Sequence, residues 1–250
     1  MVEELFGNSY MEKIWAIIPA RSGSKGLKNK NILKLNNKPL IYYTINKALK
    51  SKKFERVLFL TDSKKYAKIA KSYGAEIPFI RSKKNASDKS TDNDLYLNML
   101  KIFKKQNIQT PKFFAHLSPT VPYRKNDIIS KGVDFFFKNK KSNFQSMRSV
   151  SLYPFSAYKH NRVIDQKICS IINKDFDANK LNLPRQSYEK TYTANGLIDI
   201  ISKKNLEVNG TTHGKNTLAF LTNQLYMIDI DDKIQLTWGN FLINQGLIKI

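Results

Sequence analysis

The stretch of sequence best suited to chemistry is a short loop, residues 19–31, which combines two glycines, two serines and four cations. Glycine and serine allow several backbone N–H groups to turn toward one anion, and the cations offset its negative charge. This combination predicts a binding loop for a triphosphate. The residue order matches neither G-x-x-x-x-G-K-[ST] nor G-x-G-x-x-G, so neither of those nucleotide motifs applies. A solvated basic loop remains the plainer alternative in a chain so rich in lysine.

A second candidate lies near the C-terminus, where Asp229 and Asp231 are two residues apart. On an extended segment both carboxylates project from one face. Two carboxylates, phosphate oxygens and water form the oxygen shell that Mg²⁺ prefers, so the pair predicts a site for Mg²⁺ or Mn²⁺. The alternative is an acidic turn that caps the final helix through Asp231 or Asp232. We favour metal ligation for the first two carboxylates and assign Asp232 to the cap.

These candidates need a scaffold, and the first half of the chain alternates strand-like with helix-like segments. Short apolar runs predict strands at Ile14–Ile18, Val57–Leu60, Ile77–Ile80 and Phe113–Leu117. Apolar residues at helical spacing predict helices that begin at Pro39, at a cap on Asp62, near Leu95 and from Lys125. Strands that alternate with helices of this size predict an α/β fold with a mostly parallel, Rossmann-like sheet flanked by helices. Ligands bind such sheets at the carboxyl ends of the strands, where the 19–31 loop lies.

The regular pattern weakens in the second half of the chain. Residues 150–190 show no clear period, which predicts a small excursion from the sheet within one domain that spans residues 13–250. Strand-like segments return at Gly196–Ile201 and Leu225–Ile230, and an amphipathic segment from Lys233 to Gly246 closes the chain.

Composition narrows the class of partner. The chain has 43 basic and 20 acidic side chains and a net charge of +23, which favours anionic ligands. The lysines are spread along the whole chain and no nucleic-acid-binding motif occurs, so a nucleic-acid-binding protein is the disfavoured alternative. No apolar run approaches the ~20 residues that span a bilayer, and no membrane association is expected. The single cysteine, Cys169, excludes an internal disulfide and is typical of a reducing cytoplasm.

Several motifs, in order along the chain, resemble one family. Residues 18–31 (IPARSGSKGLKNKN) are similar to the nucleotide-binding signature of the acylneuraminate (CMP-sialic acid) cytidylyltransferases. The further matches are 60–63 (LTDS), 73–76 (YGAE), Arg81, 86–88 (ASD), 117–124 (LSPTVPYR), 185–186 (RQ), 195–196 (NG) and 229–232 (DIDD). From Lys13 onward the chain is identified as a nonulosonate-type member.

The resemblance implies a reaction and a set of residues. CMP would pass from CTP to the anomeric hydroxyl of an acidic keto sugar, with release of pyrophosphate. Arg21, Lys30 and Asp231 would be catalytic, and Asp229 and Asp231 would bind the metal. The implied nucleotide-binding residues are Ala20, Arg21, Ser22, Gly23, Ser24, Lys30, Asn31, Arg81, Ser87 and Asp88. The implied sugar-binding residues are Ser118, Thr120, Arg185, Gln186, Tyr192 and Asn195.

Arg185 fits an acidic sugar because a guanidinium pairs bidentately with a carboxylate, although a surface ion pair is the alternative. The chain also departs from the family pattern: Ser118 replaces a Gln, Val121 replaces a Ser, and Asp199 replaces an aromatic residue. Because the Gln belongs to the sugar side, the acceptor is expected to be sialic acid or a related nonulosonate such as legionaminate or pseudaminate. A Kdo-type, neutral or phosphorylated sugar is the alternative.

The resemblance also implies a cellular setting and an assembly. The expected protein is a cytoplasmic homodimer that binds CTP and an acidic sugar and serves surface glycan assembly. Residues 150–190 would form the excursion that crosses to the partner subunit.

Overall fold

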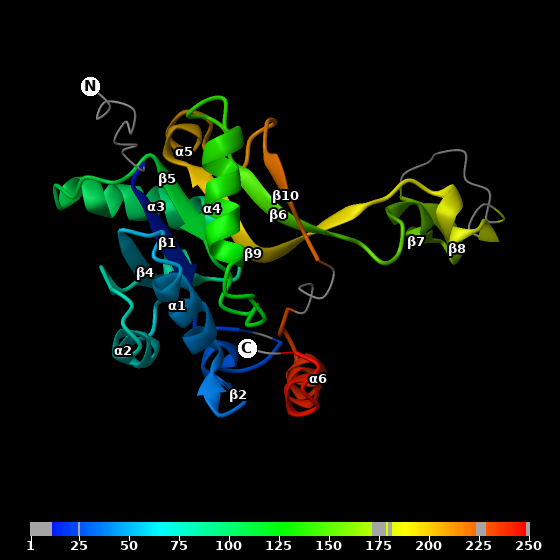
Figure 1. Ribbon diagram of the computed structural model, residues 1–250, viewed down its shortest axis with the longest axis horizontal. Coiled ribbons are helices and arrows are strands. Elements are labelled where there is room, and N and C mark those ends of the chain that lie inside the picture. The colour runs from blue at the N-terminus through cyan, green and yellow to red at the C-terminus, as the bar shows by residue number, and fades with distance from the viewer. Residues whose placement is uncertain (1–11, 25, 172–178, 180–181, 224–228, 249–250) are drawn as a thin grey trace, which may run out of the picture.

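The computed structural model describes residues 12–24, 26–171, 179, 182–223 and 229–248. Six strands of this part of the chain form the main sheet, in the order β10–β6–β9–β5–β1–β4 (Figure 1). They are β1 (Ile14–Pro19), β4 (Arg56–Leu60), β5 (Phe113–His116), β6 (Met147–Leu152), β9 (Tyr192–Ser202) and β10 (Leu218–Thr222). Only β9 runs antiparallel to its neighbours, β5 and β6. The predicted mostly parallel α/β sheet is confirmed.

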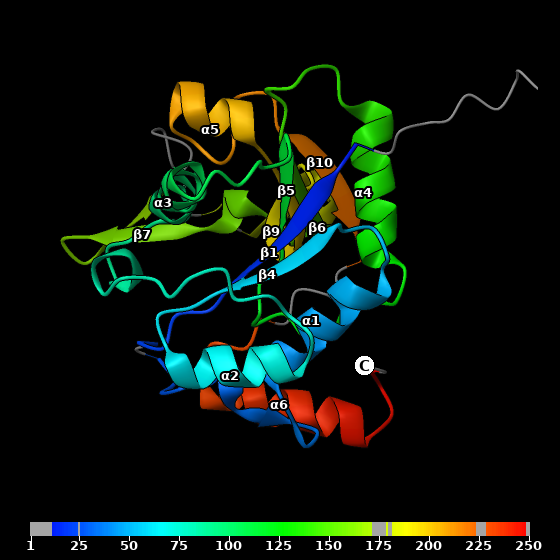
Figure 2. The same cartoon turned by 90° about the vertical axis from the view of Figure 1, so that its left-hand side faces the viewer.

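Helices cover both faces of this sheet because its strands are apolar on both sides. One core cluster joins alternate residues of β1, including Ile18, to α1 (Leu40–Lys50), α2 (Lys64–Ser72) and α4 (Ile128–Asn139). The intervening residues, including Ile17, join α3 (Asp92–Lys105) and α5 (Lys203–Asn209) on the other face. Figure 2 shows α3 and α5 on one side of the strands and α4 on the other. No helix in the described ranges is long and apolar enough to cross a membrane.

Polar caps fix where several helices begin. Ser63 caps α2 by accepting a hydrogen bond from the N–H of Tyr66, so the predicted cap on Asp62 is wrong. Asp232 caps α6 (Lys233–Asn244) and forms a capping box with Gln235, which confirms the cap predicted there. Asp62 is thereby left for a different contact, described below.

Three sequence predictions need correction. Ile77–Ile80 forms no strand: it meets β4 only through isolated bridges on either side of Pro78, which has no N–H to donate. Helix α4 begins at Ile128 rather than Lys125. The last sheet strand is β10, which was not predicted, whereas most of the predicted strand Leu225–Ile230 lies outside the described residues.

The C-terminal segment packs beneath the first loop. Strands β2 (Lys34–Leu35) and β3 (Lys38–Pro39) form a small sheet, and a third core cluster joins Leu35, Tyr123 and Ile230 with α6 alongside. Ile230 lies between the two candidate metal ligands, so its burial holds them near the loop. Short 3₁₀ helices occur at η1 (Lys30–Ile32), η2 (Lys84–Ala86), η3 (Ala157–Lys159) and η5 (Arg185–Ser187).

The predicted excursion carries its own small sheet. Strands β7 (Asn161–Ile164) and β8 (Lys167–Ser170) pair antiparallel and project far from the main sheet in Figure 1. Its apolar side chains remain in solvent: Val163 is 73% exposed, Phe155 66% and Ile171 58%.

Candidate active site

The loop that follows β1 is anchored at two points. The backbone N–H of Ser22 donates to Asp62 Oδ1 and its hydroxyl donates to Asp62 Oδ2, each at 2.7 Å. Farther along, the Asn31 side-chain amide donates to the backbone oxygen of Arg21 at 3.1 Å. These three hydrogen bonds hold the loop in its curved shape over the carboxyl end of the sheet. The role of Asp62 was missed from the sequence, although its position directly after β4 was a signal for it.

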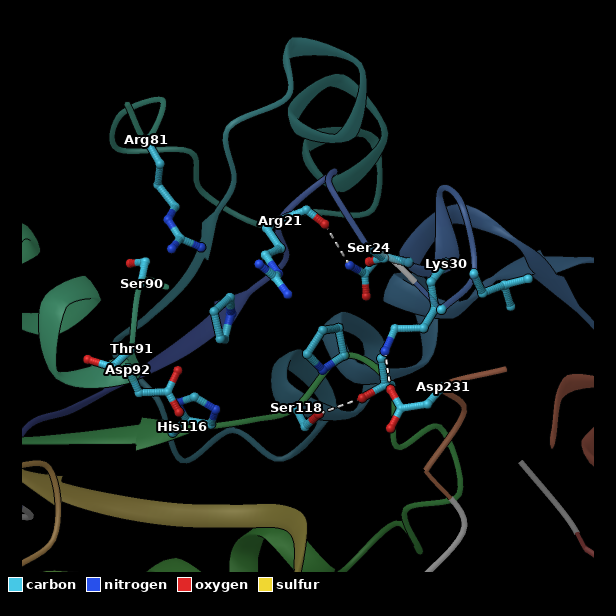
Figure 3. Close-up of a pocket in the computed structure, with 16 residues that line it drawn as sticks. Arg21, Ser24, Lys30, Arg81, Ser90, Thr91, Asp92, His116, Ser118 and Asp231 are labelled. Atoms are coloured by element: carbon cyan, nitrogen blue, oxygen red, sulfur yellow. Dashed lines mark hydrogen bonds and ion pairs between the residues drawn. The ribbon is translucent and has the colours of Figure 1, made fainter. Parts of the chain in front are cut away.

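Below this loop lies a cavity of about 500 Å³ (Figure 3). Arg21 and Lys30 point into it from the loop, and Arg81 points into it from the segment between α2 and η2. Ser118 and Thr120 line it from the turn after β5, and Ser24 and Asn31 line it from the loop; Asp231 lines it from the C-terminal segment. Sequence reasoning missed four residues that also line it: Ser90, Thr91, Asp92 and His116.

The cationic side chains of this cavity differ in their hydrogen-bond and ion-pair partners. Arg21 forms an ion pair with Asp88 at 2.7 Å, with both side chains more than a third exposed. Arg81 is 8% exposed, and its Nε is buried without a hydrogen-bond partner among the described residues. Burial lowers the pKa of Arg81 from its ordinary value. A buried donor without a partner is costly unless a ligand satisfies it, so Arg81 offers an anion a ready contact.

The first loop and the C-terminal segment meet across this cavity. Lys30 donates to Asp231 Oδ1, although 201 positions separate the two residues in the sequence. The N–H of Ile230 donates to the backbone oxygen of Thr120 at 2.9 Å, which fixes the segment between the carboxylates. The predicted convergence of the cationic loop and the C-terminal carboxylates on one place is therefore confirmed.

Asp229 and Asp231 suit a divalent ion. Oδ1 of Asp229 is buried with no hydrogen-bond partner in the described chain. Burial raises the pKa of Asp229, and the neighbouring charge of Asp231 raises it further, while Thr120 and Lys30 lower it. Two close carboxylates with an oxygen to spare fit Mg²⁺. Among the described residues no three or more His, Cys, Asp or Glu side chains are placed to hold one metal ion, so the other ligands would be phosphate and water oxygens.

A buried arginine holds the acceptor side of the site together. The guanidinium of Arg124 donates to the backbone oxygens of Ser118, Gly196 and Leu197 at 2.7, 2.9 and 2.8 Å. Complete burial lowers the pKa of Arg124 to about 9, against the opposing charge of Asp229. This side chain ties the turn after β5 to β9, and sequence reasoning gave it no role although it ends the LSPTVPYR motif.

The Asn195-Gly196 pair of β9 allows the turn after β5 to pack closely against this strand. Gly196 has φ +65°, and a Cβ there would lie 3.0 Å from the Cβ of Ser118. The side-chain amide of Asn195 donates to the hydroxyls of Ser151 and Thr222 at 2.7 and 2.6 Å. Asn195 therefore has a structural task in the sheet besides any contact with a sugar.

Other predicted residues lie elsewhere in this single chain. Arg185 and Gln186 line a separate cavity of about 380 Å³ on the excursion. Tyr192 begins β9 and is 49% exposed. Ala20 is buried below the loop, and Ser87 ends η2.

Comparison with known proteins decides the family. A family model described as cytidylyltransferase matches residues 15–218. The chain belongs to the cytidylyltransferase family. This cytidylyltransferase is 37% identical over 226 residues to the N-acylneuraminate cytidylyltransferase of Escherichia coli O18:K1:H7, covering 89% of the chain and 50% of that protein. It is 31% identical to the CMP-N,N'-diacetyllegionaminic acid synthase of Legionella pneumophila, covering 89% of the chain and 92% of the relative.

The cytidylyltransferase thus spans half the length of the first relative and nearly all of the second. Its fold is similar to a solved structure of CMP:2-keto-3-deoxy-manno-octonic acid synthetase complexed with CTP, with a TM-score of 0.68 at 14% identity. That similarity covers 94% of the chain and 99% of the solved one. The resemblance read from the ordered motifs is confirmed.

Proposed function

We propose that this cytidylyltransferase transfers CMP from CTP to the anomeric hydroxyl of a nonulosonate, an acidic keto sugar of the sialic, legionaminic or pseudaminic type. The observation that carries the proposal is the convergence of three cations and Asp231 on one cavity, with Asp229 lining the smaller cavity beside it. The relatives support this class of acceptor, because one is an N-acylneuraminate cytidylyltransferase and the other a CMP-N,N'-diacetyllegionaminic acid synthase.

The assigned roles follow from the charges of the reactants. Attack on the α-phosphate brings two anions together and releases pyrophosphate, so negative charge must be neutralised and both reactants held in position. Arg21, Lys30 and Arg81 bind the triphosphate and stabilise the departing pyrophosphate. Asn31 keeps the loop in shape for this by holding the backbone oxygen of Arg21.

Asp229 and Asp231 would hold Mg²⁺, and members of this class typically depend on a divalent metal. When bound, the ion supplies positive charge at the α-phosphate. Lys30 forms an ion pair with Asp231 and so fixes the position of that carboxylate at the edge of the cavity. CTP consumption and the single cysteine favour a cytoplasmic enzyme that supplies surface glycan assembly.

A nucleotide screen with an activity assay tests the reaction. CTP should raise the melting temperature more than UTP, ATP or dTTP, because a ligand that binds only the folded state stabilises it. Pyrophosphate release should then require CTP, Mg²⁺ and a nine-carbon keto acid together. Asp231→Ala should reduce turnover by about a thousandfold or more without loss of the fold. Stabilisation by a different nucleotide alone, or normal activity of this variant, would reject the proposal.

The same proposal assigns the excursion to a homodimer. Its exposed apolar side chains, including Val163 and Ile171, favour burial against a second copy of the chain. Arg185 lies on this excursion, away from the main cavity of its own chain. In the proposed dimer it reaches the partner's cavity and pairs with the carboxylate of the acceptor.

Mixing two inactive variants tests the dimer. If Arg185 serves the partner's site, refolding Arg185→Ala together with Asp231→Ala gives mixed dimers that each hold one intact site. About a quarter of wild-type activity should return, since half of the dimers are mixed and half of their sites work. No recovery, or sedimentation as a monomer near 28.9 kDa, would argue against the shared site.

A further inference from the structure

A second cavity of about 270 Å³ opens beside the first. The two cavities share Asp92, His116 and Ser118 as lining residues, so they adjoin each other at the carboxyl end of β5. Asp229 lines the smaller cavity and Asp231 lines the larger one, so the two candidate metal ligands lie on either side of the junction between the cavities. The smaller cavity is too small for a nucleotide but suits a substituent of a sugar that reacts at that junction.

Three residues that line this cavity lie side by side on neighbouring strands of the sheet. His116 of β5 lies opposite Asp199 of β9, and Asp199 lies opposite Arg148 of β6. Neighbouring strands are about 4.8 Å apart, so Arg148 lies about 10 Å from His116 and away from the triphosphate loop. Arg148 therefore meets the end of the acceptor that is farthest from the reacting hydroxyl.

The row is charged and partly buried. Asp199 is 4% exposed and accepts a hydrogen bond from the N–H of Ser149 at 3.1 Å. Its other oxygen lies 3.2 Å from Arg148 Nε and 3.5 Å from His213 Nε2. Since a buried carboxylate needs compensating charge, Asp199 holds the guanidinium of Arg148 in a fixed orientation.

This arrangement leaves hydrogen-bonding capacity unused. Arg148 contacts Asp199 through Nε, and no hydrogen bond from either terminal nitrogen is found within the described ranges. His213 Nε2 is buried and has no hydrogen-bond partner among the described residues. Its distance of 3.5 Å to Asp199 is a close approach that is not a hydrogen bond. The Arg148 side chain is 47% exposed, so its terminal nitrogens are free to donate to a ligand oxygen. The buried His213 Nε2 lacks a partner in the described chain, at a free-energy cost that a ligand group would relieve.

We propose that Arg148, oriented by Asp199, is a specificity-determining residue that binds an oxygen-bearing substituent at the distal end of the acceptor sugar. The inference rests on the proposed function. A carbonyl, hydroxyl or carboxylate oxygen can accept hydrogen bonds from the terminal nitrogens of the guanidinium. An apolar substituent would displace water from these nitrogens and offer no hydrogen bond in return.

Matched acceptors test the selectivity. The first pair is N-glycolylneuraminate and N-acetylneuraminate, which differ by one hydroxyl on the acyl group, and the second is a nine-carbon keto acid with and without its terminal hydroxyl. In at least one pair, wild-type kcat/KM should favour the oxygen-bearing member by about tenfold or more. Arg148→Leu should reduce that ratio to within about threefold, while the KM for CTP stays unchanged. Arg148→Lys should recover only part of it, because an ammonium lacks the planar fork.

Controls separate this role from a structural one. Arg56→Leu removes another paired arginine, at the far end of the sheet on β4, and should leave the ratio unchanged. Asp199→Asn should lower the ratio in a protein that still melts cooperatively. Equal use of both members by the wild type, or a ratio unaffected by Arg148→Leu, would overturn the specificity role alone. CTP-induced stabilisation with no pyrophosphate release from any of the four acids would reject the proposed acceptor and this inference with it.

Discussion

Ser22 and Asp62 are joined twice, by a backbone N–H and a hydroxyl that each lie 2.7 Å from a different oxygen of the same carboxylate. The contact fastens the nucleotide loop to the end of β4. It also means that the N–H of Ser22 is already occupied, so the donors available to phosphate are those farther along the loop and the cationic side chains. Asp62 thus acts as a structural anchor at the centre of an anion-binding site.

Asp62→Asn should loosen this loop. An amide accepts only through its one oxygen, so the Ser22 hydroxyl must accept from the new NH2 group instead of donating, and both contacts lose the strengthening that the carboxylate charge gives. We expect the KM for CTP to rise about tenfold, which corresponds to ~1.4 kcal/mol, with little change in the melting temperature. Steady-state kinetics with varied CTP measures this. Asp127→Asn, which removes an exposed surface ion pair with Lys131, is the control and should behave as wild type.

Asp229→Asn should stabilise the protein while abolishing its activity. A carboxyl whose pKa is raised in the folded state favours folding when protonated, and this contribution is lost as the pH rises through the raised pKa. The neutral amide avoids that loss, so the melting temperature without metal should rise by about 1–3 °C at pH 8. The difference should shrink as the pH is lowered through the raised pKa of Asp229, where the wild-type carboxyl becomes protonated. Melting curves at several pH values test the sign, and a variant less stable than wild type at pH 8 would contradict it.

Arg124→Lys should be strongly destabilising. The buried guanidinium satisfies three backbone oxygens of the Ser118 turn and β9 at once, and an ammonium cannot reach all of them. We expect a loss of about 3–5 kcal/mol in the free energy of unfolding, as for a broken buried charge network. Urea denaturation measures the loss, and Arg162→Lys on the exposed strand β7 should cost nothing measurable. A loss below about 1 kcal/mol would show that the turn does not depend on this side chain.

Gly196→Ala should disturb the acceptor side of the site. The residue has φ +65° and its new Cβ would meet the Cβ of Ser118 at 3.0 Å, so both backbone strain and crowding result. The expected cost is about 1–3 kcal/mol, with a higher KM for the acceptor and an unchanged KM for CTP. Gly210→Ala is the matched control: it has φ +67° but open space around the added atom. Equal effects of the two substitutions on acceptor KM would assign the outcome to strain alone.

Local sequence signals predicted much of the scaffold. Short apolar runs located β1, β4 and β5 because buried parallel strands must be apolar on both faces. The same signal failed at Ile77–Ile80, where an apolar run passes beside β4 but Pro78 prevents a regular ladder. The Asp62 cap failed because Ser63, one residue later, can cap α2 equally well, and only the contact with Ser22 decides between them.

Residue types and their spacing identified only some of the residues of the candidate site. Arg21, Lys30 and Asp231 were found because cations in a Gly- and Ser-rich loop and paired aspartates have recognisable spacing, and they do line one cavity. Arg148 and His213 carry no such spacing, since they come from a strand and a loop far apart in the sequence. Strand register across β5, β9 and β6 brings Arg148 beside Asp199 and His116, and register is a long-range property.

The amino-acid sequence by itself determined the family, the alternation of strands and helices, and the chemistry available to a phosphate. These depend on residue types at short separations, which local physics constrains. Only the tertiary structure decided that Lys30 meets Asp231, that Asp62 anchors the loop, and that Arg185 lies away from the cavity of its own chain. Such contacts join residues tens to hundreds of positions apart, and they exist only after the sheet has fixed which strand ends are neighbours.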